Sequence, residues 1–291
     1  MKHVHLALAL ALNLTGLIAL TGCKEQAEGE PVVRVELGDR DDAEIVPGAG
    51  GNPSPEATET PQIAVPSACK PASFEGVALT HCIADPAEHR IAVTFGPGDG
   101  SSAFGTLADY AQTVEANTIA FAMNGGAFSD DLSPKGYLVA SGARLAELNR
   151  GEGEGNFFLK PNGVFFGTGG TWRIIATDRF FSSVRDRPQF GTQSGPMLLM
   201  DGKLHPEVSE NGNSRAIRNG VGVSADGKAH FVISNDPLSY GQLARFFRDE
   251  LSVKQALFLD SNSSSLWDPA TGRMDAGRTG PIIVVTKRNP S

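Results

Sequence analysis

The chain has 291 residues, of which 40% are hydrophobic and 20% charged, with a formal net charge of −8. This composition is typical of a soluble globular protein, and the length suffices to bury a sizeable core. The charge is uneven, because residues 24–67 contain ten acidic and three basic residues, which leaves −2 for residues 68–291. A nearly neutral domain does not suit a nucleic-acid-binding protein, so no nucleic-acid partner is expected.

The first 22 residues have the pattern of a bacterial lipoprotein signal peptide. A short basic start precedes an apolar run over residues 6–20, which is too short for a comfortable membrane span. The run ends in Leu-Thr-Gly before Cys23, which resembles the lipobox in which cysteine is acylated. An acylated Cys23 anchors a protein to a membrane, and Lys24 after it resembles the signal for an outer membrane, facing the periplasm. The alternative is an ordinary cleaved signal with an incidental cysteine.

Residues 23–67 are expected to form an acidic, disordered tether. They hold Gly-Ala-Gly-Gly-Asn-Pro-Ser-Pro at 48–55, and they have too little apolar surface to offset the entropy lost on ordering. Residues 68–291 then form one domain. Cys69 and Cys82 are expected to form a disulfide in an oxidising compartment, with two buried free thiols as the alternative.

The domain is expected to be of the α+β class, with strand-rich mixed sheets and two or three helices that do not alternate regularly. Apolar runs predict strands, helical spacing of apolar residues predicts helices, and Asn-Gly or Asp-Gly pairs predict hairpin turns. In chain order, the sequence predicts a strand at 91–95, a helix at 104–116, a strand at 119–123, turns at 162–163, 201–202 and 226–227, a helix at 239–251 and a strand at 281–286.

Several familiar catalytic patterns are missing from the sequence. It has neither the G-x-S-x-G nucleophile elbow nor a phosphate loop that ends in Gly-Lys-Ser/Thr. His81, His89, His205 and His230 lack the spacing of metal ligands. No cofactor is therefore expected, although Asp260 with nearby carbonyl oxygens leaves the binding of a divalent cation open.

Five segments place polar side chains beside glycine or serine at predicted strand ends, where a ligand can approach the backbone closely. Taken singly, each segment is also explained as a turn or a strand cap. In chain order the segments contain Asn124, Gly125 and Gly126; Asn156; Gln193, Ser194 and Gly195; Arg218 and Asn219; and Asp260, Ser261 and Ser263.

In this order, the five segments resemble the phosphodiester glycosidase family over roughly residues 74–287. The patterns that carry the resemblance are Asn-Gly-Gly, Gly-Asn-Phe-x-x-x-Pro-Asn-Gly, Gln-Ser-Gly-Pro-Met-Leu and Arg-Asn-Gly-Val-Gly. The resemblance implies a hydrolase that cleaves the glycosidic bond of a sugar-1-phosphodiester in cell-envelope glycans or related metabolites. Many relatives carry Leu-Asp-Gly-Gly-Gly-Ser, where this chain reads Leu-Asp-Ser-Asn-Ser-Ser-Ser from residue 259, so its pocket is expected to differ in shape.

The chemistry of that reaction assigns roles to the candidate residues. The leaving phosphate monoester has a second pKa of about 6 and departs as an anion, so the main need is for cationic and hydrogen-bond donors. Arg218 is expected to clamp the phosphate, Asp260 to face the oxocarbenium-like carbon, and Asn124 to bind sugar hydroxyls or orient water. Substrate-binding roles are expected for Gly125, Gly126, Asn156, Gln193, Ser194, Gly195, Asn219, Ser261 and Ser263.

Some choices stay open at the level of sequence. A second carboxylate could come from Asp130, Asp131, Glu152 or Glu154, so retention and inversion of configuration are not distinguished. The sugar and the aglycone are not identified either. The alternative function is a non-catalytic envelope lipoprotein that binds phosphate-linked glycans.

Overall fold

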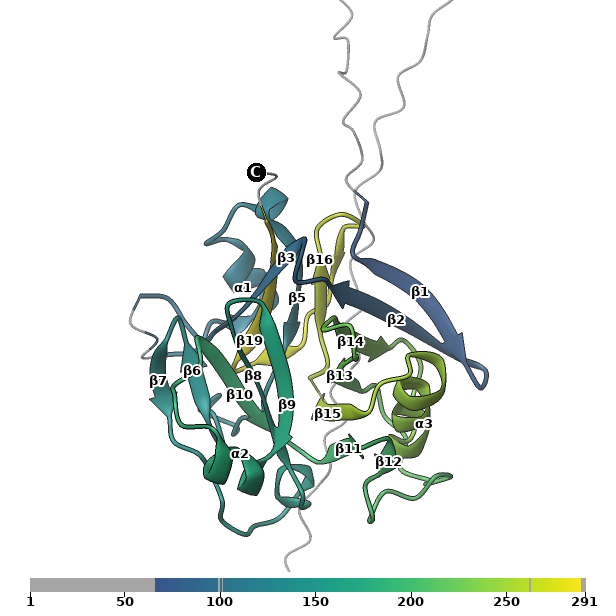
Figure 1. The fold of residues 1–291 in the computed structure, drawn as a ribbon. Coiled ribbons are helices and arrows are strands. Elements are labelled where there is room, and N and C mark those ends of the chain that lie inside the picture. The colour runs from purple at the N-terminus through teal and green to yellow at the C-terminus, as the bar shows by residue number, and fades with distance from the viewer. Residues whose placement is uncertain (1–65, 99, 101, 262, 289–291) are drawn as a thin grey trace, which may run out of the picture. The chain divides into compact units, whose positions relative to one another are not determined.

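The computed structural model describes residues 66–98, 100, 102–261 and 263–288 (Figure 1). The predicted signal peptide, Cys23 and the tether up to residue 65 lie outside the described residues. The strand-rich α+β class is confirmed. Every pairing among the described strands is antiparallel, where mixed sheets were expected. Within this part of the chain, no helix is long and apolar enough to cross a membrane.

The largest sheet has seven strands in the order β1-β2-β14-β13-β15-β11-β12. Its strand β15 has neighbours on both sides, and the four apolar residues before Asp260 are all buried. The strands are β1 (Cys69–Phe74), β2 (Val77–Ala84), β11 (Met197–Met200), β12 (Lys203–Leu204), β13 (Asn219–Val223), β14 (Ala229–Ser234) and β15 (Gln255–Asp260).

Two further sheets have five strands each, in the orders β7-β6-β10-β8-β9 and β17-β16-β5-β19-β3. The central strands β10 and β5 are buried along their whole length, and each ends in a polar residue. The first of these sheets consists of β6 (Leu138–Ala140), β7 (Ala143–Ala146), β8 (Gly163–Thr168), β9 (Thr171–Ala176) and β10 (Phe190–Ser194). The second consists of β3 (His89–Thr94), β5 (Ile119–Asn124), β16 (Leu266–Asp268), β17 (Arg273–Met274) and β19 (Ile282–Lys287), and a small pair joins β4 (Gly105–Thr106) to β18 (Arg278–Thr279).

The helices are shorter than the sequence predicts. The helix predicted over 104–116 is reduced to α1 (Leu107–Ala111) and η1 (Ala116–Thr118), because the hydroxyl of Thr113 bonds the carbonyl oxygen of Tyr110 and ends the first helix. The helix predicted over 239–251 is α3 (Tyr240–Arg245), which continues as the π-helical turn η3 (Phe246–Glu250). The expected cap is present: Ser239 and Gln242 form a capping box. The remaining helices are η2 (Asn156–Phe158) and α2 (Thr177–Ser183).

Two of the three predicted hairpin turns are confirmed. Asp201 and Gly202 both have positive φ and join β11 to β12, and Gly227 lies in the loop from β13 to β14. The third prediction was wrong, because β8 begins at Gly163 and pairs with β9 around Gly169-Gly170 instead. The amide of Asn162 there donates to the carbonyl oxygen of Phe157, so this Asn-Gly pair closes η2 and starts a strand.

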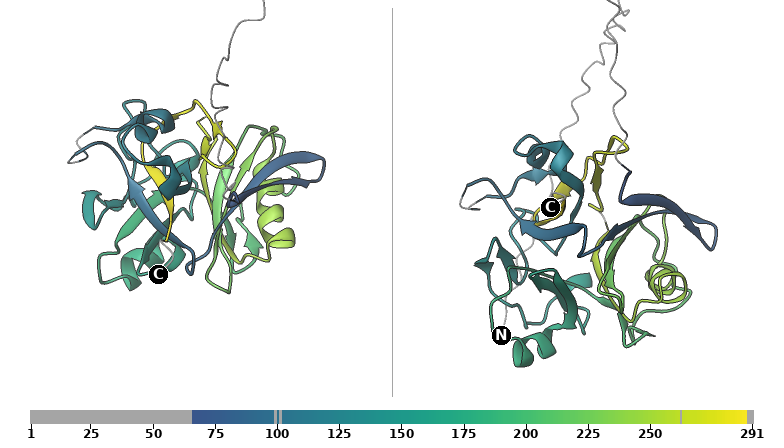
Figure 2. Two further views of the ribbon diagram at one scale, coloured as in Figure 1. Left: turned by 90° about the horizontal axis from the view of Figure 1, so that it is seen from above. Right: turned by 45° about the horizontal axis from the view of Figure 1, so that its top comes forward.

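One continuous core joins the three sheets. Phe231 on β14 packs edge-on against Phe121 on β5, with ring centroids 5.3 Å apart, and against Phe165 on β8 at 5.8 Å. Helix α3 lies against the other face of the seven-stranded sheet (Figure 2), where Leu243 and Phe247 pack with residues of β14 and β15. Because all three sheets share one packed interior, the ends of their central strands are held rigidly relative to one another.

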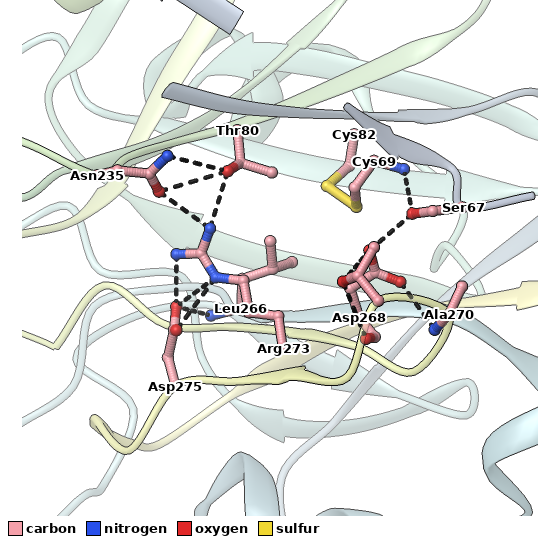
Figure 3. Close-up of a disulfide and its surroundings, with 11 residues drawn as sticks. Ser67, Cys69, Thr80, Cys82, Asn235, Leu266, Asp268, Ala270, Arg273 and Asp275 are labelled. Carbon is pink, nitrogen blue, oxygen red and sulfur yellow. Dashed lines mark hydrogen bonds and ion pairs between the residues drawn. A yellow bond between two sulfur atoms is a disulfide. The ribbon is translucent and has the colours of Figure 1, made fainter. Parts of the chain in front are cut away.

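A disulfide closes the start of the domain. Cys69 and Cys82 are direct partners across β1 and β2 and are bonded, which confirms the predicted pairing. Beside it, the hydroxyl of Ser67 donates to the carboxylate of Asp268 at 2.6 Å and accepts from the N–H of Cys69 (Figure 3). The hairpin of β1 and β2 is thereby linked to β16, which follows the serine-rich segment after Asp260.

Candidate active site

Polar residues at the ends of strands from two sheets meet in one hydrogen-bonded group. Asp260 ends β15, Asn219 begins the neighbouring strand β13, and Asn124 ends β5 of another sheet. The Asn124 amide donates to Asp260 Oδ2 at 3.2 Å, and the Asn219 amide donates to Asn124 Oδ1 at 2.8 Å. The chain of bonds fixes the orientation of each side chain, so the three form a rigid unit centred on one carboxylate.

The Asp260 carboxylate is mostly buried but well supplied with donors. Oδ1 accepts from the N–H of Ser261 at 2.6 Å, and Oδ2 accepts from the hydroxyl of Ser263 at 3.1 Å in addition to the Asn124 amide. Burial raises the pKa of Asp260, and the three donors and Lys135 oppose that rise because they favour the charged form. A carboxylate whose pKa is shifted by such opposing effects is a candidate general base, nucleophile or electrostatic stabiliser of a positive centre.

The serine-rich segment after Asp260 supports this group. The hydroxyl of Ser264 shares its one proton between the carbonyl oxygen of Asp260 at 2.9 Å and Asn219 Oδ1 at 3.3 Å. The N–H of Ser265 donates to Asn124 Oδ1 at 2.8 Å. Side-chain hydroxyls therefore make contacts here that glycines at the same positions could not make.

The third sheet contributes Ser194 at the end of β10. Its hydroxyl donates to the carbonyl oxygen of Leu259 at 2.9 Å, which ties β10 to the residue before Asp260. Gly195 follows, and a Cβ there would lie 2.6 Å from Cβ of Asn162 and 2.9 Å from the carbonyl oxygen of Phe157. Only glycine lets β10 pass this close to η2, so the Ser-Gly pair predicted from sequence has a packing reason.

A cavity of about 450 Å³ opens above this group, and we name it the Asp260 cavity. Six residues predicted from sequence line it: Asn156, Ser194, Gly195, Asp260, Ser261 and Ser263. Three further lining residues are charged and contribute to the electrostatic potential of the cavity: Asp130, Lys135 and Arg278. A guanidinium nitrogen of Arg278 donates to the carbonyl oxygen of Asp130 at 2.9 Å, which holds this cation at the cavity.

Comparisons with known proteins identify the domain. A family model described as phosphodiester glycosidase matches residues 117–278, which is more than half of the chain and includes every residue of the cavity named above. The chain belongs to the phosphodiester glycosidase family. The uncharacterized protein YigE of Escherichia coli (strain K12) is 35% identical over 186 residues, which are 63% of this chain and 71% of that protein.

Solved structures support the fold of this phosphodiester glycosidase domain. The catalytic domain of zebrafish N-acetylglucosamine-1-phosphodiester alpha-N-acetylglucosaminidase has a TM-score of 0.53 at 16% identity, with 76% of this chain and 82% of that chain covered. A hypothetical protein from Synechocystis has a TM-score of 0.50 at 15% identity, with 76% of this chain and 61% of that chain covered. At such identities, these likenesses concern the fold alone.

Gln193 lies outside the cavity lining of the phosphodiester glycosidase domain. Its Oε1 accepts from the N–H groups of Tyr137 at 2.9 Å and Asn149 at 3.0 Å, and its Nε2 donates to Asn149 O and Thr177 Oγ1. Four bonds to neighbouring chain segments leave no free donor for an anion. Gln193 therefore links β10 to the chain segments that contain Tyr137, Asn149 and Thr177.

Gly125 and Gly126 also serve packing and do not line the cavity. A Cβ on Gly125 would lie 2.3 Å from the side chain of Ile283 on β19. A Cβ on Gly126 would lie 2.0 Å from Thr192 Oγ1 on β10, and Gly126 has a φ of +109°. The two glycines let the chain after β5 pass close to β19 of its own sheet and to β10 of a second sheet, directly after Asn124.

Arg218 points to the face of the sheet that α3 covers. It is 2% exposed, its Nε donates to the carbonyl oxygen of Leu238, and its Nη2 donates to Ser214. Its guanidinium lies 3.7 Å from the ring centroid of Tyr240. The predicted phosphate clamp thus lies behind the cavity, and burial lowers the pKa of this guanidinium.

The cations that line the cavity, Lys135 and Arg278, were missed by sequence reasoning. Both lie in segments without strand or helix periodicity, and neither belongs to a pattern that singles it out. Of the four acidic residues left open as a second carboxylate, Asp130 alone lines the Asp260 cavity. Asp131 caps its own loop at Ser133, and Glu152 pairs with Lys160.

Within residues 66–98, 100, 102–261 and 263–288, no group of three or more histidine, cysteine, aspartate or glutamate side chains is placed to hold a metal ion. His205 is buried after β12, where its Nδ1 accepts from the N–H of Glu207. This histidine supports a turn and does not line the cavity.

Proposed function

We propose that this domain hydrolyses the glycosidic bond of a sugar-1-phosphodiester, with Asp260 as the carboxylate that faces the anomeric carbon. One observation carries the proposal: a mostly buried carboxylate and two cations, Lys135 and Arg278, line one polar cavity in a domain of the phosphodiester glycosidase family. The substrate presents the two matching features, a carbon that becomes positive and a phosphate that becomes more negative.

At the phosphate end, Lys135 and Arg278 take the role first expected of Arg218. Negative charge grows on the leaving phosphate as the bond breaks, and fixed cations at that position stabilise the transition state more than the bound substrate. The Asn156 amide and the hydroxyl of Ser261 line the same cavity and add hydrogen-bond donors. Lys135 and Arg278 therefore select for a substrate that carries a phosphoryl group.

At the sugar end, the ionised Asp260 stabilises the oxocarbenium-like carbon or attacks it. Asn124 holds Oδ2 of this carboxylate, so it orients Asp260 and does not itself line the cavity. Asp130 at the rim is the candidate for a second carboxylate, acting on water from across the cavity.

The proposal is tested with a panel of substrates. Purified wild-type protein should release sugar from at least one sugar-1-phosphodiester and act far more weakly on the neutral aryl glycoside of the same sugar. Sugar release is measured by chromatography, and binding is measured in parallel. Tight binding without release across the panel would favour the non-catalytic envelope lipoprotein, whose serine-rich segment replaces the glycines common in relatives.

The pH dependence of the reaction follows from the surroundings of Asp260. The ionised form is needed, and burial raises the pKa of Asp260, so activity should fall on acidification at a higher pH than an ordinary aspartate would give. Ser263→Ala removes a hydrogen bond to the charged form, which should raise this pKa further and move the acidic limb of kcat/KM to higher pH.

The matched control is Ser261→Ala, which removes a hydroxyl from the same segment but keeps the bond from the N–H of residue 261 to Asp260. Its acidic limb should stay where it is in the wild type. Identical limbs in all three proteins would show that Ser263 does not influence Asp260.

We also propose that the enzyme is lipid-anchored through Cys23 in the outer membrane and faces the periplasm. The lipobox-like sequence supports this location, and so does the disulfide, which suits an oxidising compartment. Labelled palmitate should be incorporated into the wild type and not into Cys23→Ala. Equal labelling of both proteins would contradict the anchor.

A further inference from the structure

A second polar cavity of about 570 Å³ lies beside α2, and four arginines line it. We name it the arginine groove and define it by Arg144, Arg150, Arg185 and Arg187, with Tyr137 and Phe181. None of these residues lines the Asp260 cavity. The proposed reaction makes no use of them, so their concentration at one site calls for its own explanation.

The groove carries an excess of positive charge. Arg144 pairs with Glu147 at 3.1 Å, and Arg150 pairs with Asp178 at 3.1 Å. Arg185 and Arg187 are exposed, and neither has a carboxylate within 4.0 Å among the described residues. The groove is also lined by the carboxylates Glu147 and Asp186, so its four arginines leave two positive charges in excess. Exposed guanidinium groups in such excess favour phosphate or another oxyanion as the ligand.

Aromatic groups complete the groove and point to a sugar as well as an anion. Phe181 is 59% exposed, more than any other large apolar side chain of the described residues, and the Arg150 guanidinium lies 4.3 Å from its ring centroid. The Tyr137 ring packs against Phe180, and burial raises the pKa of its hydroxyl, which therefore stays protonated as a donor. Cavities that join aromatic faces to a few polar groups are typical ligand sites.

The groove and the Asp260 cavity are close along the chain. Lys135 lines the cavity and Tyr137 lines the groove, so their Cα atoms are at most about 7 Å apart. The segment that leads from Arg150 in the groove reaches Asn156 in the cavity. The two cavities are therefore lined by neighbouring residues of the same two chain segments.

From these observations we infer that the arginine groove binds an additional anionic group of the same glycan whose phosphodiester enters the Asp260 cavity. The inference rests on the proposed function and narrows it: the substrate is an oligosaccharide with several phosphate groups, held at two places. A substrate that reaches both places gains affinity over a single sugar phosphodiester, because the second contact forms within one complex.

Binding is tested first, with phosphorylated maltohexaose and unphosphorylated maltohexaose as probes. The double variant Arg185→Gln/Arg187→Gln should bind the phosphorylated probe about 10-fold more weakly than the wild type in calorimetry, the size expected for the loss of two exposed charge pairs. The difference should shrink as salt is added, because these charges are exposed. The variant Arg90→Gln/Arg248→Gln, which loses two arginines elsewhere, should bind like the wild type.

The outcomes separate this inference from the proposed function. If no phosphodiester is cleaved but the groove variant still loses binding, the function fails and the groove stands as a binding site for anionic glycans. If wild type and groove variant bind the phosphorylated probe equally, or the neutral probe binds as well as the phosphorylated one, the groove inference is overturned. Loss of binding to anionic lipid vesicles instead of the glycan would assign the groove to a membrane surface and would also overturn it.

Discussion

Replacing Asp260 by Asn should lower the turnover of a sugar-1-phosphodiester by about 10³-fold. Asparagine keeps the size of the side chain but removes the negative charge that faces the anomeric carbon. Loss of a positioned acid–base group costs roughly 10²- to 10⁴-fold, and a nucleophile at this position would cost at least as much. The measurement is kcat for the best substrate of the panel, with sugar release followed to completion.

The fold should survive this change with a small loss of stability. Asp260 accepts three hydrogen bonds, from the N–H of Ser261, the hydroxyl of Ser263 and the amide of Asn124. In asparagine, one of the two acceptor atoms becomes a donor, so at least one of these contacts is lost. Thermal unfolding therefore accompanies the kinetics and separates lost chemistry from lost structure.

Asp131→Asn is the matched control. Asp131 follows Asp130 in the chain, but its carboxylate is exposed and forms hydrogen bonds only within its own loop, with Ser133. It should retain wild-type turnover. Asp130→Asn tests whether Asp130 is the second carboxylate. A drop in turnover of similar size would identify it as such. Wild-type turnover by Asp260→Asn would remove Asp260 from the mechanism.

Removing the disulfide should have the largest effect on stability. The variant Cys69→Ala/Cys82→Ala should lose roughly 3 kcal/mol, the value expected for a closed loop of this length. In a domain of this size, that loss corresponds to a fall in Tm of about 6–12 °C. The physical reason is that the bond restricts the unfolded chain, in which the two cysteines are otherwise free to separate.

The measurement is thermal denaturation followed by circular dichroism. Wild-type protein in reducing agent should show the same fall, and the double alanine variant should not respond to the reducing agent. A variant with an unchanged Tm would mean that the bond contributes nothing to stability in solution.

Sequence reasoning succeeded where local rules decide the structure. Asp201-Gly202 forms a turn because both residues take positive φ, and four buried apolar residues before Asp260 form a central strand. It failed at Asn162-Gly163, where glycine is needed for another reason: a Cβ on Gly163 would lie 2.4 Å from the sulfur of Met197. Such a packing demand comes from a distant segment and leaves no local pattern.

For the site, sequence reasoning found the strand ends but not the sides on which the residues lie. Neighbouring residues of a strand point to opposite faces, so of each adjacent polar pair only one joins the site. Ser194 lines the Asp260 cavity while Gln193 points away, and Asn219 joins Asn124 while Arg218 points to Tyr240. The patterns identify such pairs but do not choose between their members.

The two cations of the cavity show a second limit of predicting the site from sequence. Lys135 reaches the cavity from a loop and Arg278 from the two-residue strand β18, more than 140 residues away in the chain. Their position depends on how these segments cross the sheet ends, which only the folded chain determines.

The origin of the site in three different sheets has a consequence for engineering. Ser194, Asn124 and Asp260 each depend on a separate layer of strands, and the core phenylalanines hold the layers together. A cut in any loop between Asn124 and Asp260 separates members of this constellation, so the two halves should be inert until they reassociate. Recovery of turnover upon mixing such halves would then report on docking of the layers rather than on local refolding.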